Sequence, residues 1–286
     1  MIFRTRFAPS PTGPLHIGHA YSALLAHDAA RQHGGEFLLR IEDLDHTRAR
    51  TEWEDLIYQD LDWLGIRWDQ DPIKQSLRKD AYRSVLRGLN PDLPTFACTC
   101  SRRDIQEALG APHPDEVTYG PDGLVYPGTC RHRQYDGTSG NIQDLNLRLS
   151  LSSISDDTLN ITHYEYDNIS FDVGYENHIP FKEFEAHIGE VVLWRQGYAA
   201  YHLASVIDDA HQNITHIVRG QDLRAATHIH VLLQTLLGMP TPAYHHHRLI
   251  TDENGKRLAK RHDAKAIRKY REDGATPADI RKMVGL

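Results

Sequence analysis

Two histidines three residues apart, His16 and His19, are the side chains of this chain best placed for chemistry. Residues 2–7 have the pattern of a short strand, and the residues from His19 onward have the pattern of a helix. A strand, a tight turn and a helix N-terminus together present backbone N–H groups that bind anions. Gly18 carries no side chain that would keep a ligand away from the backbone. The spacing therefore predicts a site for nucleotide phosphates.

Three other interpretations of this segment are open. The two histidines could bind a metal, although no neighbouring cysteine or carboxylate completes a ligand set. They could be ordinary surface residues, because the chain has 19 histidines. Glu42 lies at the distance expected of the acid in a pyridine-nucleotide fold, but the glycine pattern of that fold is absent.

The cysteines form a second constellation. Cys98 and Cys100 are separated by a single residue, and Cys130 follows 30 residues after Cys100. Three thiolates and one oxygen or nitrogen donor would complete a tetrahedral structural zinc site. The alternative is that the three cysteines are free and buried without a metal.

Composition limits the classes of protein to which the chain can belong. With 286 residues, 40% hydrophobic content and a net charge of −7, it is expected to be a globular protein, and a generally basic nucleic-acid binder is excluded. No apolar run has the length of a membrane span. The odd cysteine count and the lack of a signal sequence predict the cytoplasm. Basic residues cluster between Lys256 and Arg271. This cluster could be a local patch that binds RNA, or it could be a solvated face.

The elements that must position these residues alternate between strand and helix. Strand 36–42 and helices 51–64 and 79–89 follow the first strand and helix, and strand 216–220 and helix 228–237 come later. Between them, residues 96 to about 180 are rich in proline and glycine and predict an irregular insertion with some β structure. The expected fold class is α/β, with a parallel sheet interrupted by an insertion.

The run Arg-Phe-Ala-Pro-Ser-Pro-Thr-Gly-Pro-Leu-His-Ile-Gly-His at 6–19 resembles the signature of the glutamyl branch of class I aminoacyl-tRNA synthetases, and the likeness extends from residue 4 to about 265. It implies a Rossmann-like parallel sheet with an inserted α+β zinc subdomain and a short C-terminal helical remnant. The implied boundaries are 1–95 and 186–240 for the two halves of the catalytic domain, 96–185 for the insertion and 241–286 for the remnant. No anticodon-binding domain is expected.

The same resemblance implies the roles of individual residues. His16, Gly18, His19, Arg257 and Lys260 would bind ATP, with His16, His19 and Lys260 catalytic. The segment 256–261 lies where the family has its Lys-Met-Ser-Lys-Ser loop, but Arg257 replaces the first lysine and Ala259 the serine. Positive charge remains to act on the departing pyrophosphate. The residues that would bind glutamate are Arg6, Ala8, Ser10, Glu42, Tyr201 and Arg219.

The end of the chain bears on the expected acceptor. Ordinary glutamyl-tRNA synthetases continue into a helical region that reads the anticodon, whereas this chain stops about 25 residues after Arg261. That pattern resembles the branch that activates glutamate with ATP and Mg²⁺ without tRNA and attaches it to the queuosine base of tRNA(Asp). The branch also implies Tyr126 as the fourth zinc ligand, whereas His132 would match some full-length relatives. A monomer is expected.

Two further functions stay open. The chain could charge a tRNA 3′ end in the manner of an ordinary synthetase, or it could bind tRNA or an adenylate without catalysis. A small-molecule nucleotidyltransferase shares the histidine signature. Such an enzyme has little reason to keep together the side chains of Arg6, Glu42, Tyr201 and Arg219.

Overall fold

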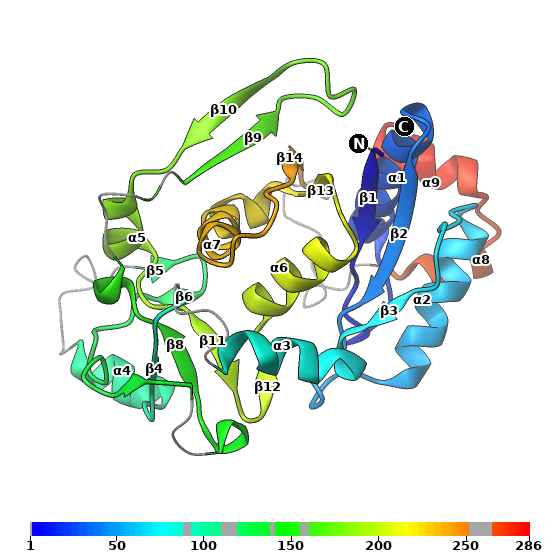
Figure 1. The fold of residues 1–286 in the computed structure, drawn as a ribbon. Coiled ribbons are helices and arrows are strands. Elements are labelled where there is room, and N and C mark those ends of the chain that lie inside the picture. The colour runs from blue at the N-terminus through cyan, green and yellow to red at the C-terminus, as the bar shows by residue number, and fades with distance from the viewer. Residues whose placement is uncertain are drawn as a thin grey trace.

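The computed structural model of the chain describes residues 2–87, 93–109, 119–137, 141–154, 159, 161–251 and 265–286. Figure 1 shows a parallel-stranded body on the right, a cysteine-containing lobe at the lower left, and a long hairpin at the top. Among the helices of these ranges, none is both long enough and apolar enough to cross a membrane.

The parallel-stranded body, called the catalytic body below, has two halves. The first half is a three-stranded parallel sheet with helices packed against it. Its order is β1-β2-β3. Helix α1 packs closely on β1 because its buried face is rich in alanine, including Ala20, Ala23 and Ala26. The elements are β1 (Arg4–Phe7), α1 (Ile17–Gln32), β2 (Glu36–Ile41), α2 (Thr51–Trp63) and β3 (Ile73–Lys74).

The second half continues from the edge of this sheet. The Thr215 N–H donates to the Arg4 carbonyl at 3.0 Å, next to the start of β13. The strand order there is β10-β9-β14-β13, and only β10 runs antiparallel to its neighbour. The elements are β9 (Thr162–Tyr166), β10 (Gly174–His178), α6 (Tyr201–His211), β13 (His216–Gly220), α7 (Arg224–Leu236) and β14 (Ala243–His247).

The lobe that contains the cysteines is a five-stranded antiparallel sheet of order β12-β11-β8-β4-β7. Its strands are β4 (Thr95–Ala97), β7 (Gln134–Tyr135), β8 (Leu147–Leu149), β11 (Val192–Arg195) and β12 (Tyr198–Ala199). Helices α4 (Arg102–Ala108) and α5 (Phe181–His187) and the short hairpin of β5 (Tyr119–Gly120) and β6 (Gly123–Leu124) complete it.

Two further pairs of helical segments remain. Segment η1 (Gln75–Arg78) leads into α3 (Lys79–Leu86), and α8 (Ile267–Glu272) and α9 (Pro277–Val284) form the C-terminal part. Ile267, Ile280 and Val284 are buried in the same apolar core as α1, so this part packs on the catalytic body.

The predicted α/β architecture with parallel strands is confirmed, with three local corrections. Helix α1 begins at Ile17 rather than at His19 because the His16 side chain caps it. Helix α7 begins at Arg224 rather than at His228. Helix α4 lies within the segment expected to be irregular, and α5 follows directly after it. The hairpin β9–β10 also lies in the range 96–185, yet it pairs with β14 of the catalytic body.

Candidate active site

A cavity of about 410 Å³ opens where β1, β2, β13 and β14 end. Ligands of open α/β sheets bind at the carboxyl ends of the strands, so this is the expected place for a substrate. Every predicted site residue of the described catalytic body lines it. These residues are Arg6, Ala8, Ser10, His16, Gly18, His19, Glu42, Tyr201 and Arg219.

The two signature histidines form the cap of α1. The Gly18 N–H donates to Nδ1 of His16 at 3.1 Å, and the His16 N–H donates to Nδ1 of His19 at 3.2 Å. The rings stack with centroids 3.8 Å apart. Because each Nδ1 accepts a hydrogen bond, a neutral ring carries its proton on Nε2. The backbone N–H groups of Gly18 and His16 are thus bonded to imidazoles, and both rings line the cavity.

The space at position 18 favours glycine. A Cβ at this position would lie 3.0 Å from Cε1 and 3.1 Å from Nδ1 of His16, which is tighter than ordinary van der Waals contact. A side chain would therefore require the His16 ring to shift by a few tenths of an ångström.

Residues 252–264, which include the predicted Arg257 and Lys260, lie outside the described part of the chain. The described residues on either side of them do meet the site. Leu249 and Ile250 line the cavity. The Ile267 N–H donates to the Leu15 carbonyl at 2.8 Å, and Ala266 forms a β-bridge with His16. One flank of the predicted loop thus lines the cavity, and the other is bonded beside His16.

Arg6 belongs to a buried cluster of alternating charges. Its Nε donates to Oδ1 of Asp209 at 3.0 Å, and Nη1 of Arg40 donates to the same oxygen at 2.6 Å. Arg40 also donates from Nη2 to Glu42 at 3.0 Å. The Arg40 side chain is 0% exposed. Two cations and two anions therefore balance within the cluster, as burial of charge requires.

The pKa values of the two carboxyl groups in this cluster are shifted in opposite directions. Burial alone would raise the pKa of Asp209, but Arg40 and Arg6 hold it below its usual value. At Glu42 burial outweighs the attraction of Arg40 and Arg6, so its pKa is raised. A cationic group of a ligand beside Glu42 would supply the missing attraction and stabilise its ionised form.

Arg219, at the end of β13, is surrounded by neutral side chains. Its Nη2 donates to Oγ1 of Thr227 at 2.6 Å, Nη1 lies 3.4 Å from Nδ1 of His230, and Nε lies 3.4 Å from Nε2 of His246. Arg219 itself is 4% exposed. Its charge meets no carboxylate among these partners, so a carboxylate of a ligand in the cavity would be strongly attracted.

A second cavity of about 940 Å³ adjoins the first and shares Ser10, Glu42 and Tyr201 with it. Tyr201 begins α6 and is 40% exposed, so it is not a core residue. The second cavity runs between the catalytic body and the cysteine lobe. Its lining includes four arginines, Arg48, Arg102, Arg148 and Arg195.

Several side chains at the site were not found from the sequence. Asp209 accepts from both Arg6 and Arg40, and Thr227, His230 and His246 hold Arg219. One signal was present: Asp208 and Asp209 stand in a helix whose neighbours are apolar, and buried carboxylates need partners. The consecutive histidines of β14 have separate partners, because successive side chains on a strand point to opposite faces.

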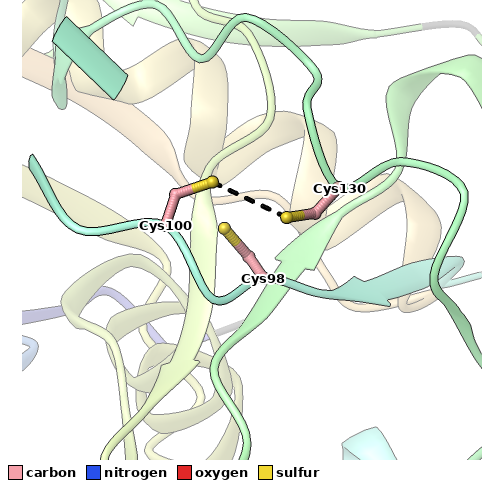
Figure 2. A group of neighbouring side chains, drawn as sticks. All are labelled: Cys98, Cys100 and Cys130. Atoms are coloured by element: carbon pink, nitrogen blue, oxygen red, sulfur yellow. Dashed lines mark hydrogen bonds between the residues drawn. The ribbon is translucent and has the colours of Figure 1, made fainter. Parts of the chain in front are cut away.

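The three cysteines converge in the lobe (Figure 2). Their sulfurs lie within 4.8 Å of one another, and those of Cys100 and Cys130 are 3.6 Å apart. Oη of Tyr126 lies 3.5 Å from the sulfurs of both Cys98 and Cys100 and accepts from the Cys130 N–H at 2.9 Å. His132 is exposed. Three sulfurs and one phenol oxygen make four candidate donors, the number that a tetrahedral zinc site requires.

Comparison with known proteins agrees with this geometry. Residues 2–286 match the family model for the catalytic domain of class I tRNA synthetases (E and Q). A glutamyl-Q tRNA(Asp) synthetase of Rhodobacter capsulatus is 48% identical over 99% of both chains. A glutamate–tRNA ligase of Oleidesulfovibrio alaskensis is 36% identical over 96% of this chain and 54% of its own length.

The fold likeness extends to solved structures. A glutamate tRNA ligase from Elizabethkingia meningosepticum, solved in complex with its amino acid, superposes with a TM-score of 0.72 at 24% identity. The match covers all of this chain and 61% of that structure, so the chain spans about three fifths of its length.

Proposed function

The chain belongs to the family of class I tRNA synthetases for glutamate and glutamine, and we propose that it activates L-glutamate with ATP and transfers it to the queuosine base of tRNA(Asp). The observation that carries this proposal is the 48% identity to the Rhodobacter capsulatus enzyme over 99% of both chains. The cavity supplies what the first step needs, because it combines Arg6, Arg219 and Glu42 with the two signature histidines.

In the first step, an oxygen of the glutamate α-carboxylate attacks the α-phosphorus of ATP. The bond to the bridging oxygen breaks, and pyrophosphate leaves with the electron pair. Nε2–H groups of His16 and His19 donate to the phosphates as negative charge builds, and Lys260 and Arg257 act from the loop whose flanks lie beside them. Mg²⁺ enters with ATP as part of the substrate.

The glutamate side chain and ammonium are bound by the rest of the cavity. Arg6 and Arg219 offer cations to the carboxylates, and Glu42 and Tyr201 face the ammonium. Ala8 and Ser10 form the wall after β1 and leave room for the substrate. This set of charges matches an amino acid with two carboxylates and one ammonium.

In the second step, a hydroxyl of the queuosine cyclopentene ring attacks the carbonyl carbon of the glutamyl-adenylate. An ester bond forms, AMP leaves, and the hydroxyl proton passes to the departing phosphate or to water. The 940 Å³ cavity adjoins the first cavity, and its four arginines can pair with phosphates of an anticodon loop; four carboxylates, those of Glu42, Asp45, Asp122 and Glu190, line it as well. Activation itself requires no RNA group in this mechanism.

Transfer of labelled glutamate to tRNA(Asp) with and without queuosine tests this function. We expect acceptance only by the queuosine-bearing form, and we expect it to persist when the terminal adenosine of that tRNA is removed. Equal acceptance without queuosine, or charging of the 3′ end of tRNA(Glu), would contradict the proposal.

We also propose that Cys98, Cys100, Tyr126 and Cys130 hold one structural zinc ion. The apolar cluster around them is small, and small cores are commonly stabilised by a metal. Metal analysis of the purified protein should find about one zinc per chain. Tyr126→Phe should lower zinc affinity, whereas the control His132→Ala should not. Absence of zinc from the wild-type protein, or the reverse order of the two variants, would be inconsistent with this site.

A further inference from the structure

The hydrogen bonds around Arg219 have a fixed direction. A guanidinium can only donate, so Nε2 of His246 and Nδ1 of His230 must both accept. Each imidazole is then neutral and carries its proton on the other ring nitrogen. Burial lowers the pKa of His246 and of His230, and the positive charge of Arg219 lowers both further, in agreement with neutral rings.

Nδ1 of His246, the ring nitrogen that does not face Arg219, contacts a buried carboxylate. Nδ1 of His246 lies 3.0 Å from Oε1 of Glu165, and only 2% of the His246 side chain is exposed. Glu165 comes from β9, which is adjacent to β14 in the sheet. A carboxylate can only accept here, so it requires the proton on Nδ1 and leaves Nε2 as an acceptor toward Arg219 and Thr227.

Glu165 is held in place from several sides. Its side chain is 6% exposed, Nε of Arg224 on α7 lies 3.2 Å from Oε1, and Nε2 of His163 on β9 lies 3.7 Å from Oε2. Burial would raise its pKa, but its bonds to His163 and His246 and the charge of Arg224 lower it well below the usual range. Glu165 is therefore an ionised acceptor at neutral pH, yet it does not line the cavity.

We propose that Glu165 is a positioning residue for glutamate binding: through His246 it fixes the hydrogen-bond direction that orients the guanidinium of Arg219. This inference rests on the proposed function, because it takes Arg219 as a cation for a glutamate carboxylate. Glu165 contributes no contact to the substrate. It determines which nitrogen of His246 bears a proton, and thereby whether Arg219 faces an acceptor or a competing donor.

An amide at position 165 separates these roles with little change in volume. The amide of Glu165→Gln can donate to Nδ1, which moves the His246 proton to Nε2. Two donors, Nε2–H of His246 and Nε–H of Arg219, then face each other, and the hydrogen bond between them is lost. We expect the KM for glutamate in ATP–pyrophosphate exchange to rise about tenfold, with the KM for ATP unchanged. The matched control is Glu176→Gln, which removes one exposed carboxylate from the neighbouring strand of the same hairpin.

Coupling distinguishes positioning from a general structural role. In a His246→Asn background, adding Glu165→Gln should cause no further rise in the KM for glutamate. Equal values for Glu165→Gln and the control, a parallel rise in the KM for ATP, or full additivity in the double variant would overturn the inference. If the wild-type protein shows no glutamate-dependent exchange at all, the proposed function fails instead.

A spectroscopic measurement on the wild-type protein covers the case in which the variants fail to fold. Nitrogen-15 NMR of labelled histidines distinguishes the two neutral tautomers and the cation. We expect His246 to carry its proton on Nδ1 at pH 7. A proton on Nε2, or a cationic ring, would overturn the inference.

Discussion

Arg6 and Arg219 line the same cavity, but the protein holds them by different chemistry. Arg6 shares Asp209 with Arg40, and Glu42 completes a balanced set of two cations and two anions. Arg219 is held by Thr227 and two neutral imidazoles. A balanced cluster can be kept in the interior without a ligand, whereas an uncompensated cation gains most when a carboxylate binds. We therefore expect Arg6 to serve both stability and substrate binding, and Arg219 to serve substrate binding.

Removing the shared anion should have the largest effect. Asp209→Asn leaves Arg6 and Arg40 with Glu42 as their remaining carboxylate, and breaking a buried ion pair costs about 3–5 kcal/mol of unfolding free energy. Urea denaturation measures it. The control Asp62→Asn removes the carboxylate of an exposed pair with Arg67 and should cost at most about 1 kcal/mol. Similar losses for the two variants would mean that the buried cluster is not balanced as described.

Removing the uncompensated cation should impair catalysis rather than folding. Arg219→Gln should lower kcat/KM for glutamate in pyrophosphate exchange by about 10²- to 10³-fold, because one partner of a buried charge pair with the substrate is lost. The free energy of unfolding should change by less than about 1 kcal/mol, since the partners of Arg219 are neutral and its removal leaves no buried charge unpaired.

Arg6→Gln provides the contrast. It should lower both activity and stability, because it leaves the carboxylates of the cluster in excess. The exposed Arg67→Gln serves as a control for both assays. If Arg219→Gln destabilised the protein as much as Arg6→Gln, the comparison between the two arginines would fail.

Acid should affect the two regions over different pH ranges. The folded pKa of His230 lies well below 6.5 because of burial and Arg219, so its contribution to stability is present above pH 6.5 and lost as pH falls below it. The folded pKa of Asp209 is lowered, so its contribution is lost only as pH falls below about 3.8.

Denaturation midpoints between pH 7 and 5 measure the histidine part of this dependence. His230→Gln should flatten the curve in that range, and His211→Gln, a change of an exposed histidine, should leave it unchanged. An unaltered slope in His230→Gln would show that the imidazoles around Arg219 are not held neutral by the fold.

The sequence predicted the lining of the cavity better than what lies behind it. Arg6, Glu42 and Arg219 come directly at strand ends, where periodicity and the family signature both locate a ligand site. Glu165 and His246 meet across two parallel strands that are 81 residues apart in the chain. That pairing depends on the strand order of the sheet, which local patterns do not encode.

Helix limits show the same distinction on a smaller scale. The periodicity of α2 predicted its extent to within one residue, because its apolar spacing is local information. The start of α1 was placed two residues late because histidine is an unusual capping residue, and its acceptor role follows only from the tautomer that the turn selects.

The most direct test of the account is ATP–pyrophosphate exchange by the purified protein without RNA, with glutamate, glutamine and aspartate compared. We predict exchange with glutamate, and at least about 10²-fold less with glutamine, because glutamine lacks the second carboxylate for which the cavity reserves a cation. Equal exchange with glutamine, or no exchange with glutamate, would contradict the account.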